Sequence, residues 1–339
     1  MTRATGVGSH PGDDQAAYDE ALRVVLGLLA EDGDVGLPYL PEVPGRGAPA
    51  GMVGRTLALV RDLGVDLQPA GWRVVGESAG SGIDHRRARS LLAQDLDTLE
   101  ERTQEYAGDL KVQVTGPWTL AAVVERPRGD KVLGDRGLRR DLADALAEGV
   151  RTHVADVRRR VPGAARLVVQ VDEPVVGAVA SGEVRTASGF HRHRTVDRPE
   201  LSETLGRVLS AVDEAGGEPW VHSCAPGVPW DLVRAAGARG LLTDPGLLDG
   251  AGLDVVAAAL EAGDVVGLGV VPTTGPVPGD QAVVERVERW LDMVGLDPET
   301  PGLLLTPACG LGGPGSPGQS AGDARTRLTR VRDAARSLR

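Results

Sequence analysis

Short apolar runs alternate with long amphipathic segments along the whole chain, and this alternation constrains the fold more than any other feature. Eight runs have the length of buried strands, and each precedes a segment with helical periodicity, such as Leu138–Arg160. Strands that alternate with helices pair in parallel through right-handed crossovers. Eight such units predict an α/β protein built as a (β/α)8 barrel. The expected strands are Thr5–Ser9, Asp34–Pro38, Lys111–Thr115, Arg166–Asp172, Pro219–Ser223, Gly240–Thr243, Val265–Val270 and Leu303–Pro307, with an extra short strand or hairpin over Leu67–Val75.

The length fits one domain of this kind. A barrel of eight βα units takes about 250 residues or more as a single unit, and the chain has 339. Hydrophobic residues make up 41% and charged residues 25%, which is typical of a globular protein. No stretch has the composition of a long linker, so we expect a single domain over residues 1–339.

Net charge, the lack of long apolar runs and the two cysteines indicate which partners and which cellular compartment to expect. The formal net charge is −11, which argues against nucleic-acid binding, because that requires clustered Lys and Arg. No run approaches the length of about 20 apolar residues that spans a bilayer, and no signal peptide is evident. We therefore expect a cytoplasmic protein with no membrane partner, in which Cys224 and Cys309 stay reduced.

Residues suited to metal binding fall at the ends of the expected strands. In a (β/α)8 barrel the carboxyl ends of the strands form the active-site face. His222 and Cys224 lie two positions apart on extended chain, so their side chains project to the same side. Cys309 follows the last strand, and Asp244 follows the sixth. Two thiolates and an imidazole favour zinc over magnesium or calcium, with Asp244 as the fourth ligand. Two unrelated core cysteines are the alternative.

Acidic and small residues at the same ends suggest a substrate site. Asp172 and Glu173 end a buried strand, where Asp172 is suited to bind an ammonium group or to act in acid–base catalysis; a helix-capping role is the alternative. Gly8 and Ser9 offer backbone N–H groups and a hydroxyl for a carboxylate. Glu42 lies in a proline-rich segment, where a ligand contact and a solvated loop are equally good interpretations.

Taken together, these motifs resemble a known family. Their order is similar to that in the catalytic C-terminal barrel of cobalamin-independent methionine synthase, and the resemblance covers nearly the whole chain, as a short single-domain form. The related uroporphyrinogen decarboxylases share the barrel but lack the His–x–Cys and later Cys. The motifs are Val7-Gly8-Ser9, Val114-Thr115-Gly116-Pro117, Gln170-Val171-Asp172-Glu173-Pro174, His222-Ser223-Cys224 and Pro307-Ala308-Cys309-Gly310-Leu311.

The resemblance implies roles for individual residues. It implies Zn2+ held by His222, Cys224 and Cys309, with Asp244 where the family has a glutamate. It further implies that a set of four residues binds homocysteine, two at its carboxylate and two at its amine: Gly8, Ser9, Asp172 and Glu42. Two departures affect the methyl donor: nothing corresponds to the family's N-terminal barrel, and residues 270–274 lack the Asp and His that the family carries there.

The expected function is a zinc-dependent methyltransferase that forms methionine from homocysteine, with Asp172 as the catalytic residue. The methyl donor implied is methyltetrahydrofolate or a methylcorrinoid, the latter carried on a partner protein. Three alternatives stay open from the residues alone. They are a methyltransferase for another thiol with a corrinoid donor, a zinc hydrolase that uses the open metal position for water, and a zinc-dependent accessory subunit without activity.

Overall fold

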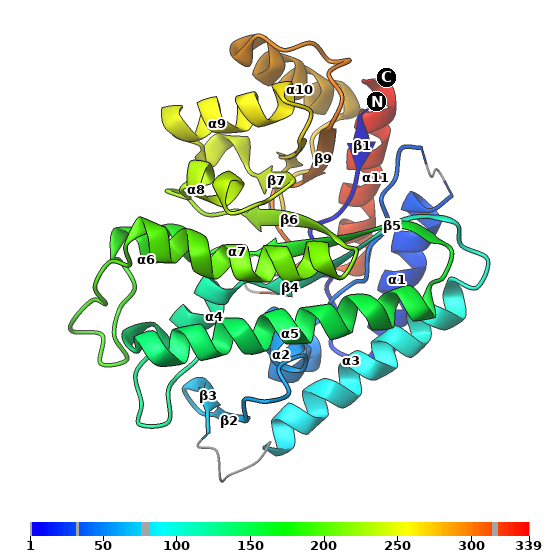
Figure 1. Ribbon diagram of the computed structural model, residues 1–339. Helices are drawn as coiled ribbons and strands as arrows, with labels where there is room; N and C mark the ends of the chain where they lie inside the picture. The colour runs from blue at the N-terminus through cyan, green and yellow to red at the C-terminus, as the bar shows by residue number, and fades with distance from the viewer. Residues whose placement is uncertain (1, 32–33, 76–81, 314–317, 339) are drawn as a thin grey trace.

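A parallel sheet of seven strands forms the centre of the computed structural model, which describes residues 2–31, 34–75, 82–313 and 318–338. The strand order is β1-β9-β8-β7-β6-β5-β4, and every neighbouring pair is parallel (Figure 1). The strands are β1 (Arg3–Ala4), β4 (Gly108–Thr115), β5 (Ala164–Asp172), β6 (Glu218–Ser223), β7 (Gly240–Thr243), β8 (Val265–Val271) and β9 (Leu303–Pro307).

The prediction of eight regular strands is confirmed only in part. The segment expected as the second strand, residues 34–38, forms isolated bridges in place of a strand: Gly36 bridges Ala4 in β1, and Tyr39 bridges Lys111 in β4. Backbone hydrogen bonds from Leu37 to Ala4 and from Leu40 to Lys111 accompany these bridges. The segment thus lies between the two edge strands of the seven-stranded sheet, but it does not form the regular eighth strand of a (β/α)8 barrel.

The first strand was predicted at the wrong position: it spans Arg3–Ala4, before the expected Thr5–Ser9, and is shorter. Only Arg3–Ala4 forms a regular strand with β9. Thr5 still donates a backbone hydrogen bond to Leu305, and further along the segment Ser9 bridges Glu42. The expected hairpin is confirmed: the antiparallel strands β2 (Val65–Gln68) and β3 (Gly71–Val74) form a separate two-stranded sheet.

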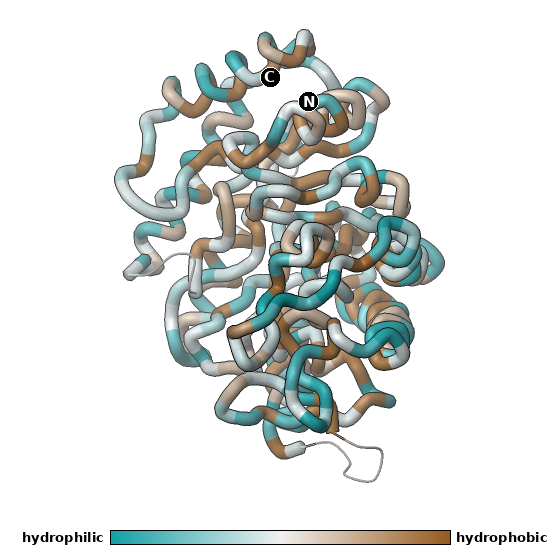
Figure 2. Tube along the Cα trace, turned by 90° about the vertical axis from the view of Figure 1, so that its left-hand side faces the viewer, coloured by the Kyte–Doolittle hydropathy of each residue, from teal (hydrophilic) through white to brown (hydrophobic). Residues whose placement is uncertain are grey.

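Long helices cover the outside of the sheet (Figure 1). Helix α5 shows why they form there: its buried residues Leu142, Leu146, Val150 and Val154 recur every four positions and make one apolar face. Hydrophilic and hydrophobic residues alternate along the helical turns (Figure 2). The long helices are α1 (Gln15–Leu29), α3 (Ile83–Arg102), α5 (Arg136–Arg160), α7 (Arg198–Glu214), α9 (Gly250–Glu261), α10 (Asp280–Val294) and α11 (Ala321–Ser337).

Shorter helices follow several strands and shape the pocket described below. They are α2 (Met52–Leu57), α4 (Pro117–Val123), α6 (Val176–Ser181) and α8 (Trp230–Ala235), together with the 3-10 helices η1 (Pro44–Arg46), η2 (Ala48–Ala50), η3 (Val132–Gly134) and η4 (Pro245–Leu247). None of the helices within the described residues combines the length and the apolar composition needed to cross a bilayer.

The inside of the sheet is apolar at one end and polar at the other. A small cluster of buried residues from five different segments fills the end at which the strands begin: Leu37, Val168, Trp220, Leu242 and Leu304. Further along β4, β5 and β6, toward their carboxyl ends, buried polar residues occupy alternate positions: Lys111, Gln113, Gln170, Asp172 and His222. A polar interior is unusual for a sheet of this kind, because its inward-facing side chains are normally branched and apolar.

Candidate active site

A pocket of about 550 Å³ opens at the carboxyl ends of the strands. Its lining includes seven of the eight residues predicted from the sequence to form the site: Gly8, Ser9, Glu42, Asp172, His222, Cys224 and Cys309. They come from segments up to 301 positions apart in the chain, as the numbers of Gly8 and Cys309 show. The fold therefore gathers the predicted substrate residues and three of the four predicted metal ligands around one space.

The imidazole of His222 is held by a carboxylate. Asp172 and His222 are paired residues of the adjacent strands β5 and β6, and Nδ1 of His222 lies 2.7 Å from Oδ1 of Asp172. The other ring nitrogen, Nε2, is buried and has no hydrogen-bond partner among the described residues. A buried nitrogen without a partner is costly, and a histidine held at one nitrogen by a carboxylate is typical of a metal ligand.

The two cysteines are reduced and lie close to each other. Neither forms a disulfide, and both are half-buried. A hydrogen bond between the two thiols is the largest cause of the shifts in their pKa values. It raises the pKa of Cys224 and lowers the pKa of Cys309. The charge of His222 adds to the lowered pKa of Cys309. Cys309 is thus the thiol that ionises first.

Asp244 is placed differently from the other predicted ligands. It follows β7 and caps η4, where its Oδ1 accepts a hydrogen bond of 2.9 Å from the backbone N–H of Gly246. It is not among the residues that line the pocket. Within the described residues, no group of three or more His, Cys, Asp and Glu side chains is arranged closely enough to hold a metal ion.

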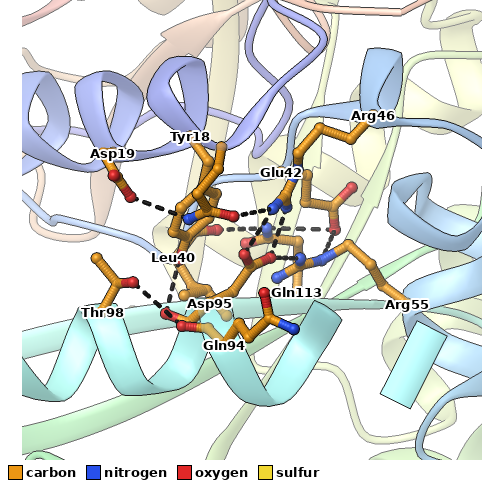
Figure 3. Close-up of polar contacts among 11 residues, drawn as sticks. Tyr18, Asp19, Leu40, Glu42, Arg46, Arg55, Gln94, Asp95, Thr98 and Gln113 are labelled. Atoms are coloured by element: carbon orange, nitrogen blue, oxygen red, sulfur yellow. Dashed lines mark hydrogen bonds and ion pairs between the residues drawn. The ribbon is translucent and has the colours of Figure 1, made fainter. Parts of the chain in front are cut away.

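Glu42 is a buried carboxylate rather than a solvated loop residue. Only 5% of it is exposed, and burial raises its pKa to about 7. It accepts a hydrogen bond of 3.3 Å from Nε2 of Gln113 and lies 3.8 Å from Nε of Arg55. Arg55 in turn bonds to the fully buried Asp95 of helix α3, so Glu42 is tied to a network of charged residues behind the pocket (Figure 3).

The turn formed by Gly8 and Ser9 is held in place by the loop that follows β9. The Ser9 hydroxyl donates to the carbonyl of Gly312 at 2.8 Å and accepts from its N–H at 3.2 Å. A Cβ at Gly8 would lie 3.0 Å from the side chain of Gln113, so a larger residue at this position would require that side chain to shift. Because the hydroxyl of Ser9 already bonds to Gly312, backbone groups of the turn are the better candidates for binding a ligand.

Glu173 has a structural role. Its side chain is fully buried and accepts hydrogen bonds of 2.8 Å from the backbone N–H groups of Trp118 and Thr119, and of 2.6 Å from the Thr119 hydroxyl. These groups belong to the first turn of α4. Glu173 therefore caps α4, which is the helix-capping alternative considered for the two adjacent acids, while Asp172 faces the pocket.

The sequence analysis missed the polar residues beneath the pocket. Lys111 and Gln113 lie two positions apart on β4, as do Gln170 and Asp172 on β5, so each pair faces the same side of its strand. All four are buried. Polar residues at every second position of an otherwise apolar strand were the signal that could have identified them.

Comparison with known proteins identifies the class. The fold and site define an α/β protein with a thiol- and imidazole-lined pocket at the ends of a parallel sheet. Residues 103–337 match the model of the family described as cobalamin-independent synthase, catalytic domain. This match covers more than half of the chain, and the chain belongs to that family.

A solved structure supports the same fold. A B12-independent methionine synthase from Shewanella sp. W3-18-1, in complex with selenomethionine, superposes with a TM-score of 0.63 at 14% identity, covering 99% of this chain and 97% of that one. The carboxyl transferase domain of Rhizobium etli pyruvate carboxylase has a TM-score of only 0.26 at 16% identity, over 71% of this chain and 44% of that one, which is too low to indicate a shared fold. A search of curated proteins found no matching sequence.

Proposed function

We propose that this protein is a zinc-dependent methyltransferase that transfers a methyl group to the thiol of homocysteine and so forms methionine. Membership of the cobalamin-independent synthase family supports methyl transfer, and the similar Shewanella structure holds selenomethionine. The single observation that carries the proposal is the unpaired, buried Nε2 of His222 in the same pocket as two thiols. We further propose that residues 34–38, although they form no regular strand, close the sheet into a (β/α)8 barrel with the bridges that Gly36 and Tyr39 form to β1 and β4. We also propose that residues 1–339 form one domain and that the protein is cytoplasmic.

The residues present fit zinc. His222 would bind through Nε2, because Nδ1 is occupied by Asp172, and Cys224 and Cys309 would supply two thiolates. Asp172 would then orient the imidazole and raise its basicity, as carboxylates behind metal-bound histidines do. Asp244 would be the fourth ligand, which requires its carboxylate to leave the N–H of Gly246. When bound, zinc would lower the pKa of an incoming thiol and so supply a thiolate at neutral pH.

The chain's own side chains would hold the amino-acid end of the substrate. Glu42 and Asp172 line the same pocket and together would bind the ammonium group. The carboxylate of Asp172 accepts the hydrogen bonds described for it, from Gln170 and His222, through Oδ1. Its other oxygen, Oδ2, would therefore be available for the ammonium. Backbone groups of Gly8 and Ser9 would hold the carboxylate. Holding the substrate in the geometry for attack is itself worth several kcal/mol.

Part of the pocket lining is apolar and would face the methyl donor. It includes Trp72, Met52, Val53 and Pro44, of which Trp72 is 5% exposed. Such a wall excludes water from the transferred methyl group and offers an aromatic surface to a flat donor. Methyltetrahydrofolate and a methylcorrinoid both present a large ring system, so both are proposed donors.

Zinc content and methionine formation test the proposal together. We expect purified protein to hold about one zinc per chain, and Cys309→Ser and His222→Gln to lose both the zinc and the activity. His85→Gln is the matched control, because His85 is also fully buried but bonds to the carbonyl of Leu57. Activity is measured from homocysteine with methyltetrahydrofolate and with methylcobalamin. Full zinc content in the Cys309→Ser variant would argue against the site.

A second variant separates homocysteine from a thiol without an amino group. Asp172 is unsuitable for this purpose, because it also holds His222 and its replacement would disturb the metal site. Glu42 has no contact with His222 among its described partners, so Glu42→Gln removes charge from the ammonium site without removing a contact of the predicted metal ligand. The substitution also removes the ion pair with Arg55. We expect this variant to keep its zinc and to raise the KM for homocysteine about tenfold. An unchanged KM would favour a substrate without an amine.

A further inference from the structure

A lysine is fully buried inside the sheet, beneath the pocket. Lys111 belongs to β4 and none of it is exposed, although lysine is among the residues least often buried. The chain has only one other lysine, Lys131. Burial lowers the pKa of Lys111 to about 7, with Asp172 and Glu42 as the neighbouring charges that oppose this shift. An ammonium in this place is costly, which suggests that it does more than fill space.

The contacts of Lys111 connect two parts of the pocket. Its Nζ donates to the carbonyl of Val7 at 3.1 Å and to Oε1 of Gln170 at 2.8 Å, and it lies 4.9 Å from the centre of the Tyr39 ring. Two oxygens and an aromatic face account for the three N–H groups of an ammonium. Val7 immediately precedes the Gly8–Ser9 turn, which is proposed to hold the substrate carboxylate.

Lys111 also helps to hold the amide of Gln170 in one orientation. An ammonium only donates hydrogen bonds, so it requires the oxygen of Gln170 on its side. The NH2 group must then face away from Lys111, where it donates to the carbonyl of Val7 at 2.9 Å and to Oδ1 of Asp172 at 2.8 Å. Without the lysine, the oxygen of Gln170 would lose its buried donor, and only the two hydrogen bonds from its NH2 group would hold the amide in place.

We propose that Lys111 is a positioning residue for amino-acid recognition: it fixes the Val7 carbonyl directly and the Asp172 carboxylate through Gln170. One buried ammonium thus sets the distance between the group that binds the substrate carboxylate and the group that binds its amine. This inference rests on the proposed function, because the two ends it connects are those assigned to homocysteine.

Binding of two related ligands tests the inference. Methionine uses both ends of the site, whereas 4-(methylthio)butanoate lacks only the amino group. In the unaltered protein we expect methionine to bind at least tenfold more tightly, as measured by calorimetry. Lys111→Met should raise the Kd for methionine at least tenfold and that for 4-(methylthio)butanoate less than threefold. The control Lys131→Met removes a lysine whose Nζ donates to the carbonyl of Val123 and touches none of the proposed substrate-binding residues, and it should change neither.

Gln170→Glu keeps the inference testable if Lys111→Met does not fold. This near-isosteric change keeps an acceptor for Lys111 but removes the donor to Asp172, and we expect the same selective loss of methionine affinity. Two results would overturn the inference: a folded variant that binds methionine within threefold of the unaltered protein, or equal losses for both ligands, which indicate a general structural role. Failure of the unaltered protein to prefer methionine would instead reject the proposed function.

Discussion

The buried charges behind the pocket lead to a prediction about stability. Asp95 of α3 is fully buried and accepts two hydrogen bonds from Arg46, of 2.8 and 2.7 Å, and one from Arg55 (Figure 3). The side chains of both arginines are also buried, with 4% and 6% exposed. With Glu42 as the second acid, two guanidinium groups balance two carboxylates. Asp95→Asn removes one of these carboxylates and keeps the shape of the side chain.

The size of the effect follows from burial. Breaking a buried ion pair by removing one partner costs about 3–5 kcal/mol, because the remaining charge stays buried without compensation. An unfolding entropy of about 2.1 cal/mol/K per residue gives about 0.7 kcal/mol/K for 339 residues. Asp95→Asn should therefore lower Tm by about 4–7 °C.

Calorimetric melting of the variant and a surface control measures this difference. Glu214 pairs with Arg151 at 2.7 Å, but their side chains are 60% and 40% exposed. Such a pair is worth about 0–1 kcal/mol, so Glu214→Gln should lower Tm by about 1 °C or less. Adding Arg46→Met to Asp95→Asn should recover part of the loss, since it removes the unpaired charge. Equal melting of the Asp95→Asn and Glu214→Gln proteins would refute the reasoning.

Three further predictions concern pH, packing and the metal. Burial lowers the pKa of His153 to about 4, against about 6.5 in the unfolded chain. Between these values only the unfolded chain binds the proton, so the free energy of unfolding falls as the pH drops from about 6.5 toward 4. His153→Gln should remove up to about 1.4 kcal/mol per pH unit of this dependence, as measured by urea unfolding. Gly36→Ala would place a methyl group 2.0 Å from a carbonyl oxygen of α1 and should cost about 1–3 kcal/mol, whereas Gly27→Ala, which has open space, should cost nothing in the same assay. Asp244→Ala should weaken zinc binding at least tenfold in competition with a chelator; the cap-removing control Asp249→Ala should not, and equal affinities would show that Asp244 is no ligand.

The sheet was predictable where its strands are continuous apolar runs. Residues 265–270 were expected as a strand, and β8 spans Val265–Val271, because a strand buried on both faces needs apolar residues throughout. The segments around Gly6 and Gly36 were predicted wrongly as regular strands. A side chain at Gly6 would meet Tyr39 at 2.2 Å, and one at Gly36 would meet the backbone of α1. These glycines allow close approach of irregular chain, which a pattern of apolar residues does not reveal.

The candidate site was predictable to the extent that its residues sit at strand ends. Asp172, His222 and the two cysteines follow from that rule, and all of them line the pocket. The network around Asp95 could not be predicted, because its partners come from separate loops and helices and a charged residue on a helix normally faces water. Only the three-dimensional arrangement shows that its neighbours exclude solvent.

The bonds between Ser9 and Gly312 have a consequence for how this protein acquires its pocket. The two residues are 303 positions apart, and β1 pairs with β9 at a similar separation. During synthesis on the ribosome, the turn at Ser9 emerges early and can pair with Glu42, but its partner Gly312 is made only when nearly the whole chain has been translated. Contacts between such distant segments form slowly. Ligand binding should therefore develop only after translation has passed residue 312, as a late event that nascent-chain experiments can time.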